Sequence, residues 1–366
     1  MFSVMLVFGT RPEAIKMCPL VRELTARGRF HVVTVVSGQH REMLDGVLSS
    51  FGVTPAYDLS LMREGQSQQA LVGAMLAGIS DILSQEKPDL VLVHGDTTTT
   101  FTAALSCFYM GIDVGHVEAG LRTYDMASPF PEEFNRQATG LVAKYHFAPT
   151  QAAAENLLRE GKRRETVFVT GNTGIDALKF TVRPDYHSPL LTWAEEGRLV
   201  LLTLHRRESI GEPMKRMLAA IKKAAQERQD ARILIPVHPN PAVRRIVQNM
   251  LGDCPAVRIC SPLDVVDFHN LMARAHMILT DSGGIQEEAA ALGVPTLVLR
   301  DRTERPEGID AGVLRLAGTS FEGVYRGFCE LYDSAVLRKA MRNAKNPYGD
   351  GRASARIADI LEERII

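Results

Sequence analysis

Carboxylate side chains stand directly after short apolar segments of this chain, where buried parallel strands would end. Asp96 follows "VLVHG", Glu118 follows "VGHV", and Glu132 lies a little further on, in "SPFPEEFNR". Grouped carboxylates raise one another's pKa, so that one can serve as a base while another serves as an acid. The three residues therefore predict proton-transfer chemistry. Two plainer interpretations compete with this one: Asp96 caps the next helix, and each glutamate pairs with a neighbouring arginine.

The first apolar segment runs into the turn "GTRPEAIK". Thr10 and Glu13 have the spacing of a capping box, and Pro12 falls in the first helical turn, where it costs no hydrogen bond. A helix N-terminus offers free amides and a partial positive charge to phosphate, and Arg11 and Lys16 add two cations. The turn predicts an anion site; the alternative is that both cations are solvated surface charges. No G-x-G-x-x-G follows, which argues against a dinucleotide site.

Two further apolar segments, in the second half of the chain, are followed by histidine. His205 stands in "VLLTLHRRES" with Arg206 and Arg207 behind it, a combination suited to an anionic ligand. His238 has a matching position in "ILIPVHPNP", with weaker support because its proline-rich context fits a plain strand exit. The alternative for each histidine is an ordinary core or surface residue.

The most specific pattern in the second half is "MILTDSGGIQEEAAALG". Residues 282–284, Ser-Gly-Gly, bring bare backbone to a helix N-terminus, which is a seat for a diphosphate. Glu288 lies one turn further, where its carboxylate can accept both hydroxyls of a ribose. The loop "RDRTERPEG" after the next apolar segment adds Glu304 and Arg305. Plain helix capping is the alternative.

The elements that must position these residues are apolar segments of strand length, which alternate with longer amphipathic stretches. They cover 4–8, 32–36, 90–93, 114–117, 145–148 and 167–170, then 199–204, 233–237, 257–259, 277–280, 296–299 and 313–316. Runs without polar alternation are typical of strands buried on both faces, in parallel sheets covered by helices. The pattern predicts an α/β protein with two Rossmann-like parallel sheets.

The domain boundary is expected near "GNTGIDAL" and the irregular segment behind it. We predict an N-terminal domain of residues 1–171, with a last helix, 353–366, packing back on it, and a C-terminal domain of residues 172–352. Ligands of open α/β sheets bind beyond the carboxyl ends of the strands. The two domains are therefore expected to face each other across a cleft sized for a nucleotide diphosphate that carries a sugar.

Composition sets limits on partners and cofactors. The chain has 366 residues, 45% of them hydrophobic, and a net charge of −1. The balance gives no bulk attraction to nucleic acid or to anionic lipid. No leader or membrane-spanning segment is recognised. Five cysteines without metal-ligand spacing suggest reduced thiols, so we expect a cytoplasmic protein with no metal and no cofactor.

Taken in order, these motifs resemble those of the non-hydrolysing UDP-N-acetylglucosamine 2-epimerases. The set is "FGTRPEAIKM", "SGQHREML", "VLVHGDTTTT", "GHVEAGLRT", "SPFPEEFNR", "HFAPT", "TGNTGIDAL", "HRRES", "ILTDSGGIQEEA", "RDRTERPE" and "NPYGDGRAS". Each motif is weak alone, but the ordered set spans nearly the whole chain and is highly specific.

The resemblance implies a glycosyltransferase B-type fold, a homodimer, and interconversion of UDP-GlcNAc and UDP-ManNAc for envelope polysaccharides. The implied mechanism removes the C2 proton while UDP leaves C1 in an anti elimination, giving 2-acetamidoglucal. UDP then adds back with protonation on the opposite face. Nothing is oxidised, which agrees with the lack of a nicotinamide motif.

The resemblance also assigns roles residue by residue. The catalytic set comprises Asp96, Glu118, Glu132 and His205. The substrate-binding set comprises Arg11, Lys16, Ser282, Gly283, Gly284 and Arg305 for UDP, Glu288 for the ribose, and Phe268 beside the uracil. Positions matching a second, activating UDP-GlcNAc site are Gln39, Gln66, Arg206 and His238.

Three residues depart from the family pattern. Leu204 precedes the histidine where relatives have a small residue, which suggests a shifted backbone near His205. Glu42 and Gly65 stand where glutamine and arginine are expected, which argues against activation by substrate. Three other functions stay open: a hydrolysing 2-epimerase that releases ManNAc and UDP, a UDP-sugar glycosyltransferase of the same fold, and a non-catalytic UDP-sugar sensor.

Overall fold

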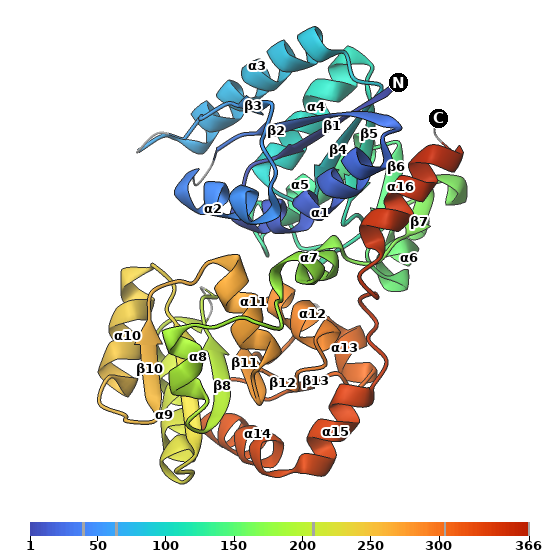
Figure 1. The fold of residues 1–366 in the computed structure, drawn as a ribbon. Coiled ribbons are helices and arrows are strands. Elements are labelled where there is room, and N and C mark those ends of the chain that lie inside the picture. The colour runs from blue at the N-terminus through green and yellow to red at the C-terminus, as the bar shows by residue number, and fades with distance from the viewer. Residues whose placement is uncertain (39–40, 63–64, 207–208, 304, 365–366) are drawn as a thin grey trace. The chain divides into compact units, whose positions relative to one another are not determined.

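Strands and helices alternate along the whole chain in the computed structural model, which describes residues 1–38, 41–62, 65–206, 209–303 and 305–364 (Figure 1). Gln39, Arg207 and Glu304 lie outside the described residues, as does the side chain of Glu42. The chain divides into two compact units: Met1–Phe180 with Gly349–Ile366, and Thr181–Tyr348.

The first unit is built on one parallel sheet. Its strands, in the spatial order β3-β2-β1-β4-β5-β6-β7, are β1 (Phe2–Phe8), β2 (Phe30–Val36), β3 (Tyr57–Asp58), β4 (Leu90–His94), β5 (Asp113–Val117), β6 (Tyr145–Ala148) and β7 (Val167–Val169). Its helices are α1 (Arg11–Arg27), α2 (Arg41–Phe51), α3 (Gln68–Glu86), α4 (Thr98–Met110), α5 (Glu132–Val142), α6 (Gln151–Arg159), α7 (Thr173–Thr181) and α16 (Ala353–Arg364).

The second unit repeats this plan. Its parallel strands, in the order β10-β9-β8-β11-β12-β13, are β8 (Arg198–Thr203), β9 (Ala231–Pro236), β10 (Val257–Cys260), β11 (Met277–Thr280), β12 (Thr296–Val298) and β13 (Leu314–Leu316). Its helices are α8 (Pro189–Ala194), α9 (Glu212–Gln226), α10 (Pro241–Leu251), α11 (Val265–Ala273), α12 (Gly283–Ala291), α13 (Pro306–Asp310), α14 (Phe321–Asp333) and α15 (Ala335–Asn343).

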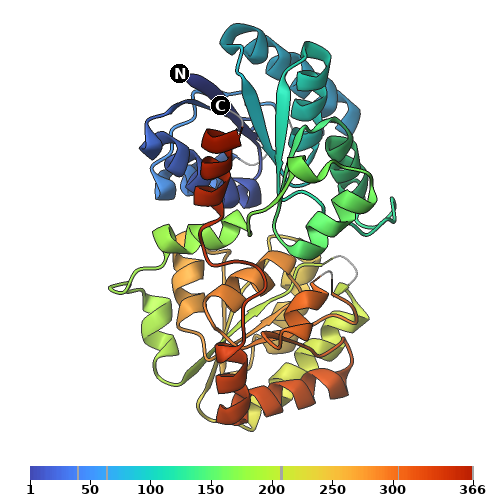
Figure 2. The ribbon, with the colours of Figure 1, turned by 90° about the vertical axis from the view of Figure 1, so that its right-hand side faces the viewer.

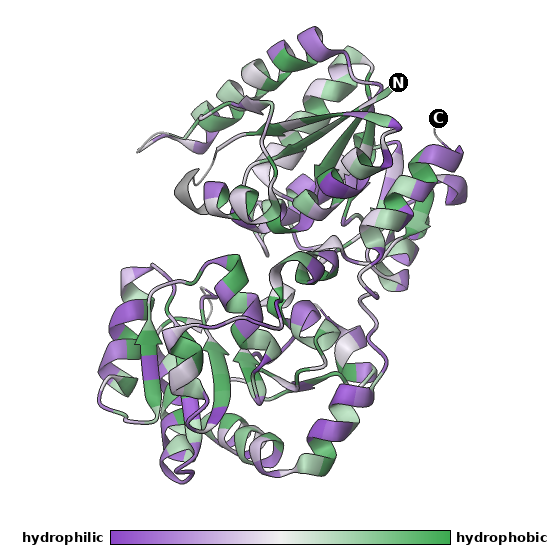
Figure 3. Ribbon diagram, in the orientation of Figure 1, coloured by the Kyte–Doolittle hydropathy of each residue, from purple (hydrophilic) through white to green (hydrophobic). Residues whose placement is uncertain are grey.

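Burial explains why the apolar segments form strands. The side chains of β1 from Val4 to Phe8, and those of β4 from Leu90 to Val93, are fully buried on both sides of the sheet. Figure 3 shows the strands of both units as predominantly hydrophobic, with hydrophilic residues on the outer helices. The predicted α/β class with two parallel sheets is confirmed, and each expected segment falls on a strand. The two-residue strand β3, too short and polar to be recognised, was not predicted.

The division between the units lies at Phe180 rather than at Gly171. Helix α7 stays with the first unit because the Phe180 ring meets Phe51 edge-on, with a centroid separation of 5.8 Å. The Asp176 carboxylate of α7 accepts hydrogen bonds from the amides of Ala353 (3.1 Å) and Ser354 (2.8 Å). These bonds attach α7 to the start of α16, which lies beside α1 (Figures 1 and 2).

Strand order decides which loops meet. In the first unit β4 lies between β1 and β5, so the turns after these three strands emerge side by side at the carboxyl edge of the sheet. In the second unit β11 lies between β8 and β12 in the same way. These edges carry the motifs singled out in the sequence, as expected for ligand sites of open α/β sheets.

Candidate active site

The turn after β1 forms the predicted capping box. Thr10 is the N-cap of α1, and its hydroxyl accepts from the Glu13 amide at 3.3 Å. Glu13 Oε2 accepts in return from the amides of Thr10 (2.8 Å) and Gly9 (3.1 Å). Arg11 is the first residue of α1 and is half-buried. The cap fixes the start of the helix and with it the place where Arg11 leaves the backbone.

Glu13 does more than cap its helix. Its second oxygen, Oε1, accepts from the hydroxyls of Thr97 (2.7 Å), the N-cap that follows β4, and of Thr100 (3.2 Å), in the first turn of α4. The carboxylate is buried, and this burial raises the pKa of Glu13 against the opposing effect of its hydrogen bonds. Glu13 therefore ties together the two turns that carry Arg11 and Asp96.

Glu118 follows β5 with a φ of +62°, a left-handed conformation uncommon for residues other than glycine. Its Oε2 forms an ion pair with Lys16 Nζ and accepts from Asn172 Nδ2 at 3.2 Å. His94 Nε2 lies 3.7 Å from the same oxygen. Burial lowers the pKa of His94 to about 3, so this neighbour is neutral near pH 7. Lys16 is thus a partner of Glu118 and not a solvated surface charge.

Asp96, which follows β4, does not cap α4. That role belongs to Thr97, whose hydroxyl accepts from the Thr100 amide at 3.1 Å. Asp96 Oδ2 instead meets Arg136 Nη2 at 2.5 Å. Desolvation raises the pKa of Asp96; the charge of Arg136 opposes the rise and that of Glu118 adds to it. Asp96 and Glu118 are therefore close enough for the charge of Glu118 to raise the pKa of Asp96.

Glu132 and Glu133 play different parts at the start of α5. Glu133 is fully buried and accepts from the amides of Thr123 and Tyr124, both at 3.0 Å. Although burial opposes the effect, these bonds, that from Gln137 and the charge of Arg136 lower the pKa of Glu133. Pairing with an arginine, the plainer interpretation, therefore applies to Glu133.

Glu132 is the first residue of α5 and half-buried. It lies four residues before Arg136, so both side chains leave the same face of the helix. Arg136 forms an ion pair with Asp96 from this face. Glu132 thus lies on the face of α5 that carries Arg136, the ion-pair partner of Asp96.

A buried aspartate organises the turn after β8. Asp281 Oδ2 accepts from the amides of His205 and Arg206, both at 3.0 Å, and Oδ1 lies 3.0 Å from His205 Nδ1. Leu204, the departure from the family pattern, is buried in the core of the second unit. His238 stacks on His205 with a centroid separation of 6.0 Å.

The N-terminus of α12 has the features of an anion site. Ser282 is the N-cap, yet its hydroxyl makes no capping hydrogen bond, so plain capping does not explain this serine. A Cβ built on Gly283 would lie 3.6 Å from the guanidinium of Arg305 and 3.8 Å from that of Arg206. A Cβ on Gly284 would meet nothing within 4 Å. Bare backbone, a helix N-terminus and two guanidinium groups therefore converge at this point.

Two more predicted residues are joined through His269. Its Nε2 lies 3.5 Å from Glu288 Oε2, and its Nδ1 contacts the Thr181 hydroxyl at 2.7 Å. Phe268, half-buried, lies beside it with a ring separation of 6.4 Å. Glu288 and Phe268 are thus held on one side of the α12 start. Arg305 is buried and forms an ion pair with Glu287.

Comparison with known proteins identifies the family of this chain. The model of the UDP-N-acetylglucosamine 2-epimerase family matches residues 22–362. The UDP-N-acetylglucosamine 2-epimerase of Bacillus subtilis (strain 168) is 52% identical over 359 residues, 98% of this chain and 94% of that protein. The chain belongs to the UDP-N-acetylglucosamine 2-epimerase family.

Solved structures agree with this family assignment. The crystal structure of UDP-GlcNAc 2-epimerase from Neisseria meningitidis bound to UDP-GlcNAc matches with a TM-score of 0.92 and 43% identity, covering 99% of this chain and 100% of that one. The glycosyltransferase of kitacinnamycin, 13% identical, matches with a TM-score of 0.66 over 100% of this chain and 99% of its own. That likeness supports the glycosyltransferase-type fold alone.

The positions that match the family's activator site belong to both units. His238 and Arg206 belong to the surroundings of His205 and Gly283. Gln66 is half-buried and precedes α3, and Gln39 lies outside the described residues. Gly65 has a φ of +74°, a conformation that an arginine would adopt only with strain. The backbone therefore gives a physical reason for glycine where the family pattern has arginine.

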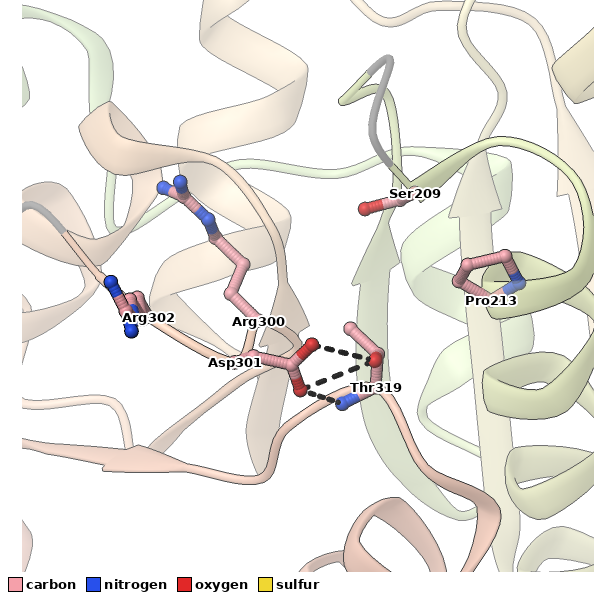
Figure 4. Close-up of a pocket in the computed structure, with 6 residues that line it drawn as sticks. All are labelled: Ser209, Pro213, Arg300, Asp301, Arg302 and Thr319. Atoms are coloured by element: carbon pink, nitrogen blue, oxygen red, sulfur yellow. Dashed lines mark hydrogen bonds between the residues drawn. The ribbon is translucent and has the colours of Figure 1, made fainter. Parts of the chain in front are cut away.

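A pocket of about 300 Å³ opens among the loops that follow β8, β12 and β13 in the second unit (Figure 4). Its lining residues are Ser209, Pro213, Arg300, Asp301, Arg302 and Thr319. Asp301 accepts from the amide of Thr319 at 2.9 Å and from its hydroxyl, which joins the loops after β12 and β13 (Figure 4).

Among the described residues, no group of three or more His, Cys, Asp or Glu side chains is placed to hold a metal ion. No helix in this part of the chain has both the length and the hydropathy to cross a bilayer.

Several residues of the site escaped the sequence analysis. Asp281 and His94 stand at strand ends within recognised motifs, so an assumed strand order would have drawn attention to both. Asn172 also stands in a recognised motif after a strand, but β7 lies two strands away from β5, so strand order alone would not have paired it with Glu118.

Proposed function

We propose that this chain is a non-hydrolysing UDP-GlcNAc 2-epimerase that interconverts UDP-GlcNAc and UDP-ManNAc. The observation that carries the proposal is the acidic edge of the first unit, where Glu118 lies against Lys16 and Asn172 and influences the pKa of Asp96. A sugar transfer does not call for a base with a raised pKa at this place, whereas any inversion at C2 does, because the C2–H bond must break. A related protein is bound to UDP-GlcNAc in its crystal structure, which supports the substrate.

We assign nucleotide binding to the second unit. The amides at Ser282, Gly283 and Gly284 and the guanidinium of Arg305 are suited to the diphosphate. Glu288 is assigned to the ribose hydroxyls and Phe268 to the uracil. Arg11, Lys16 and His205 are further donors proposed for the diphosphate. Loss of one such donor typically costs about 3 kcal/mol of barrier, roughly a hundredfold in rate.

The proposed reaction has two steps, and electrons balance in each. A carboxylate of the set Asp96, Glu118 and Glu132 takes the C2 proton, and the C–H electrons form the C1–C2 double bond. The C1–O bond breaks, and UDP leaves with its electron pair. In the return step a UDP oxygen attacks C1 while C2 is protonated on the opposite face. A raised carboxylate pKa favours this chemistry, because the C2 proton is poorly acidic.

Incubation with UDP-GlcNAc in deuterated water tests the proposal. We expect deuterium at C2 and a mixture of both UDP-sugars, read by NMR and mass spectrometry. Free ManNAc with UDP would indicate the hydrolysing reaction, and sugar transfer to an added acceptor would indicate a glycosyltransferase. Unlabelled UDP-GlcNAc that is bound but never converted would contradict the proposal in favour of a sensor.

We further propose that the chain forms a homodimer through α4 and α5. Phe101 of α4 meets Phe134 of α5 edge-on at 5.4 Å, and these two helices run in the same direction from neighbouring strands. Two turns further along lie Phe108 and Leu141, exposed to 59% and 77%, and Tyr109 beside them is exposed to 79%. Such an apolar stripe is typical of an interface between protein chains.

A further inference from the structure

Asp281 and His205 are neighbours because their strands are neighbours. β8 and β11 pair in parallel, with Thr203 opposite Thr280, and the two hydroxyls lie 2.7 Å apart. His205 follows β8 after one residue, and Asp281 follows β11 directly. The Asp281 carboxylate has an exposed fraction of 0%. A buried carboxylate needs hydrogen-bond donors to offset its desolvation.

The donors come from one short segment. The amides of His205 and Arg206 donate to Oδ2 at 3.0 Å, and His205 Nδ1 lies 3.0 Å from Oδ1. An ionised carboxylate can only accept, so the third contact requires a proton on Nδ1. Asp281 thus fixes the backbone of the turn, the orientation of the imidazole and the nitrogen that carries its proton.

The opposite edge of the ring is left for a ligand. The His205 side chain is 38% exposed while Asp281, which contacts Nδ1, is fully covered; Nε2 lies on the other side of the ring from this contact. His238 covers one face of the ring at a centroid separation of 6.0 Å. Its own Nδ1 accepts from the Asn240 amide at 3.2 Å, and a nitrogen that accepts carries no proton. Among the described residues, the charged partner that contacts His205 is Asp281, and the guanidinium groups of Arg206 and Arg305 lie beside Gly283.

We propose that Asp281 is a positioning residue that keeps Nδ1 of His205 protonated and so makes Nε2 the atom that gains a proton and donates it in a hydrogen bond to a phosphate oxygen. This inference rests on the proposed function, because it takes the diphosphate of UDP as the ligand of His205. When the negatively charged diphosphate binds, Nε2 takes up a proton from water. The resulting imidazolium lies between two negative groups, the carboxylate of Asp281 and the diphosphate. A charge-assisted hydrogen bond of this kind is roughly twice as strong as a neutral one.

The test replaces Asp281 by asparagine. The amide oxygen of Asp281→Asn can still accept from the two backbone amides, but its NH₂ group would face Nδ1 and turn that nitrogen into an acceptor. The proton then moves to Nε2, and the ring stays neutral when UDP binds. The control is Asp176→Asn, which replaces a buried aspartate of the first unit that accepts one backbone amide on each oxygen and, among the described residues, makes no contact with a histidine.

Nitrogen-15 NMR of histidine-labelled full-length chain reports the state of each ring, and His205→Gln identifies the signal of His205. We expect an Nδ1–H ring without UDP and a doubly protonated ring with UDP, in the wild type and in Asp176→Asn. In Asp281→Asn we expect an Nε2–H ring in both states and UDP binding weakened about tenfold. An unchanged His205 signal in the folded Asp281→Asn variant would overturn the inference. This readout does not depend on turnover, so failure of the epimerase reaction would leave it intact and would be seen separately.

Discussion

Substitution of Glu13 tests whether its carboxylate holds the turn after β1 against the start of α4. Glu13→Ala removes the acceptor of two backbone amides, Gly9 and Thr10, and of the hydroxyls of Thr97 and Thr100. Each buried amide left without an acceptor costs about 1–3 kcal/mol, so the two amides alone predict a loss of about 2–6 kcal/mol. Glu13→Gln fits the same place, because its oxygen can accept from the amides while its NH₂ donates to the hydroxyls. We expect the glutamine variant to lie within about 1 kcal/mol of the wild type.

The difference in unfolding free energy between Glu13→Gln and the wild type should depend on pH in a definite direction. Because burial raises the pKa of Glu13 above its ordinary 4.5, the folded chain binds a proton there more readily than the unfolded chain. The wild type therefore loses stability as pH rises from the ordinary to the raised value, and a glutamine at this position does not. The unfolding free energy of Glu13→Gln relative to the wild type should rise with pH over that interval.

Hydrogen exchange with mass spectrometry measures the local free energy of opening at both turns, in peptides covering residues 4–24 and 90–104. The control is Glu23→Ala, on the surface of the same helix, where Glu23 pairs with Arg27 at 2.9 Å and a change below about 1 kcal/mol is expected. Equal protection in Glu13→Ala and Glu13→Gln would refute the reasoning, as would an alanine variant that exchanges like the wild type.

Three other changes test the proposed roles. Glu118→Gln should lower turnover by about 10²–10⁴, the usual contribution of a general base, with UDP affinity preserved in calorimetry; near-normal turnover would remove Glu118 from the catalytic set. Gly283→Ala should fold, because its methyl group would meet guanidinium atoms no closer than 3.6 Å, but should weaken UDP binding about tenfold or more, whereas Gly73→Ala on an open helix surface should not. Tyr109→Glu combined with Leu141→Glu should convert the dimer to a monomer in light scattering, and a monomeric wild type would contradict the proposed interface.

The fold could be predicted because its information is local. Strands buried on both faces consist of continuous apolar residues, which can be recognised in the sequence. The capping box of Thr10 and Glu13 likewise depends on two residues only three positions apart. The contacts that organise the site were harder to foresee, because they join residues distant in sequence. Glu13 reaches Thr97, and Asp281 reaches His205, only because of the order of the strands, which periodicity does not specify. The division at Phe180 likewise depends on the packing of one ring against Phe51.

The last helix has a consequence for biosynthesis. Ile357, Ala358 and Leu361 of α16 are fully buried, and Arg27 of α1 meets Asp359 at 2.7 Å, so the first unit is completed by residues that follow the whole second unit. On the ribosome the first unit must wait, with the apolar surface that α16 covers still exposed, until α16 has been synthesised. A chain that stops before residue 353 would carry an intact second unit and an unfinished first one, and would be a target for chaperones and proteases.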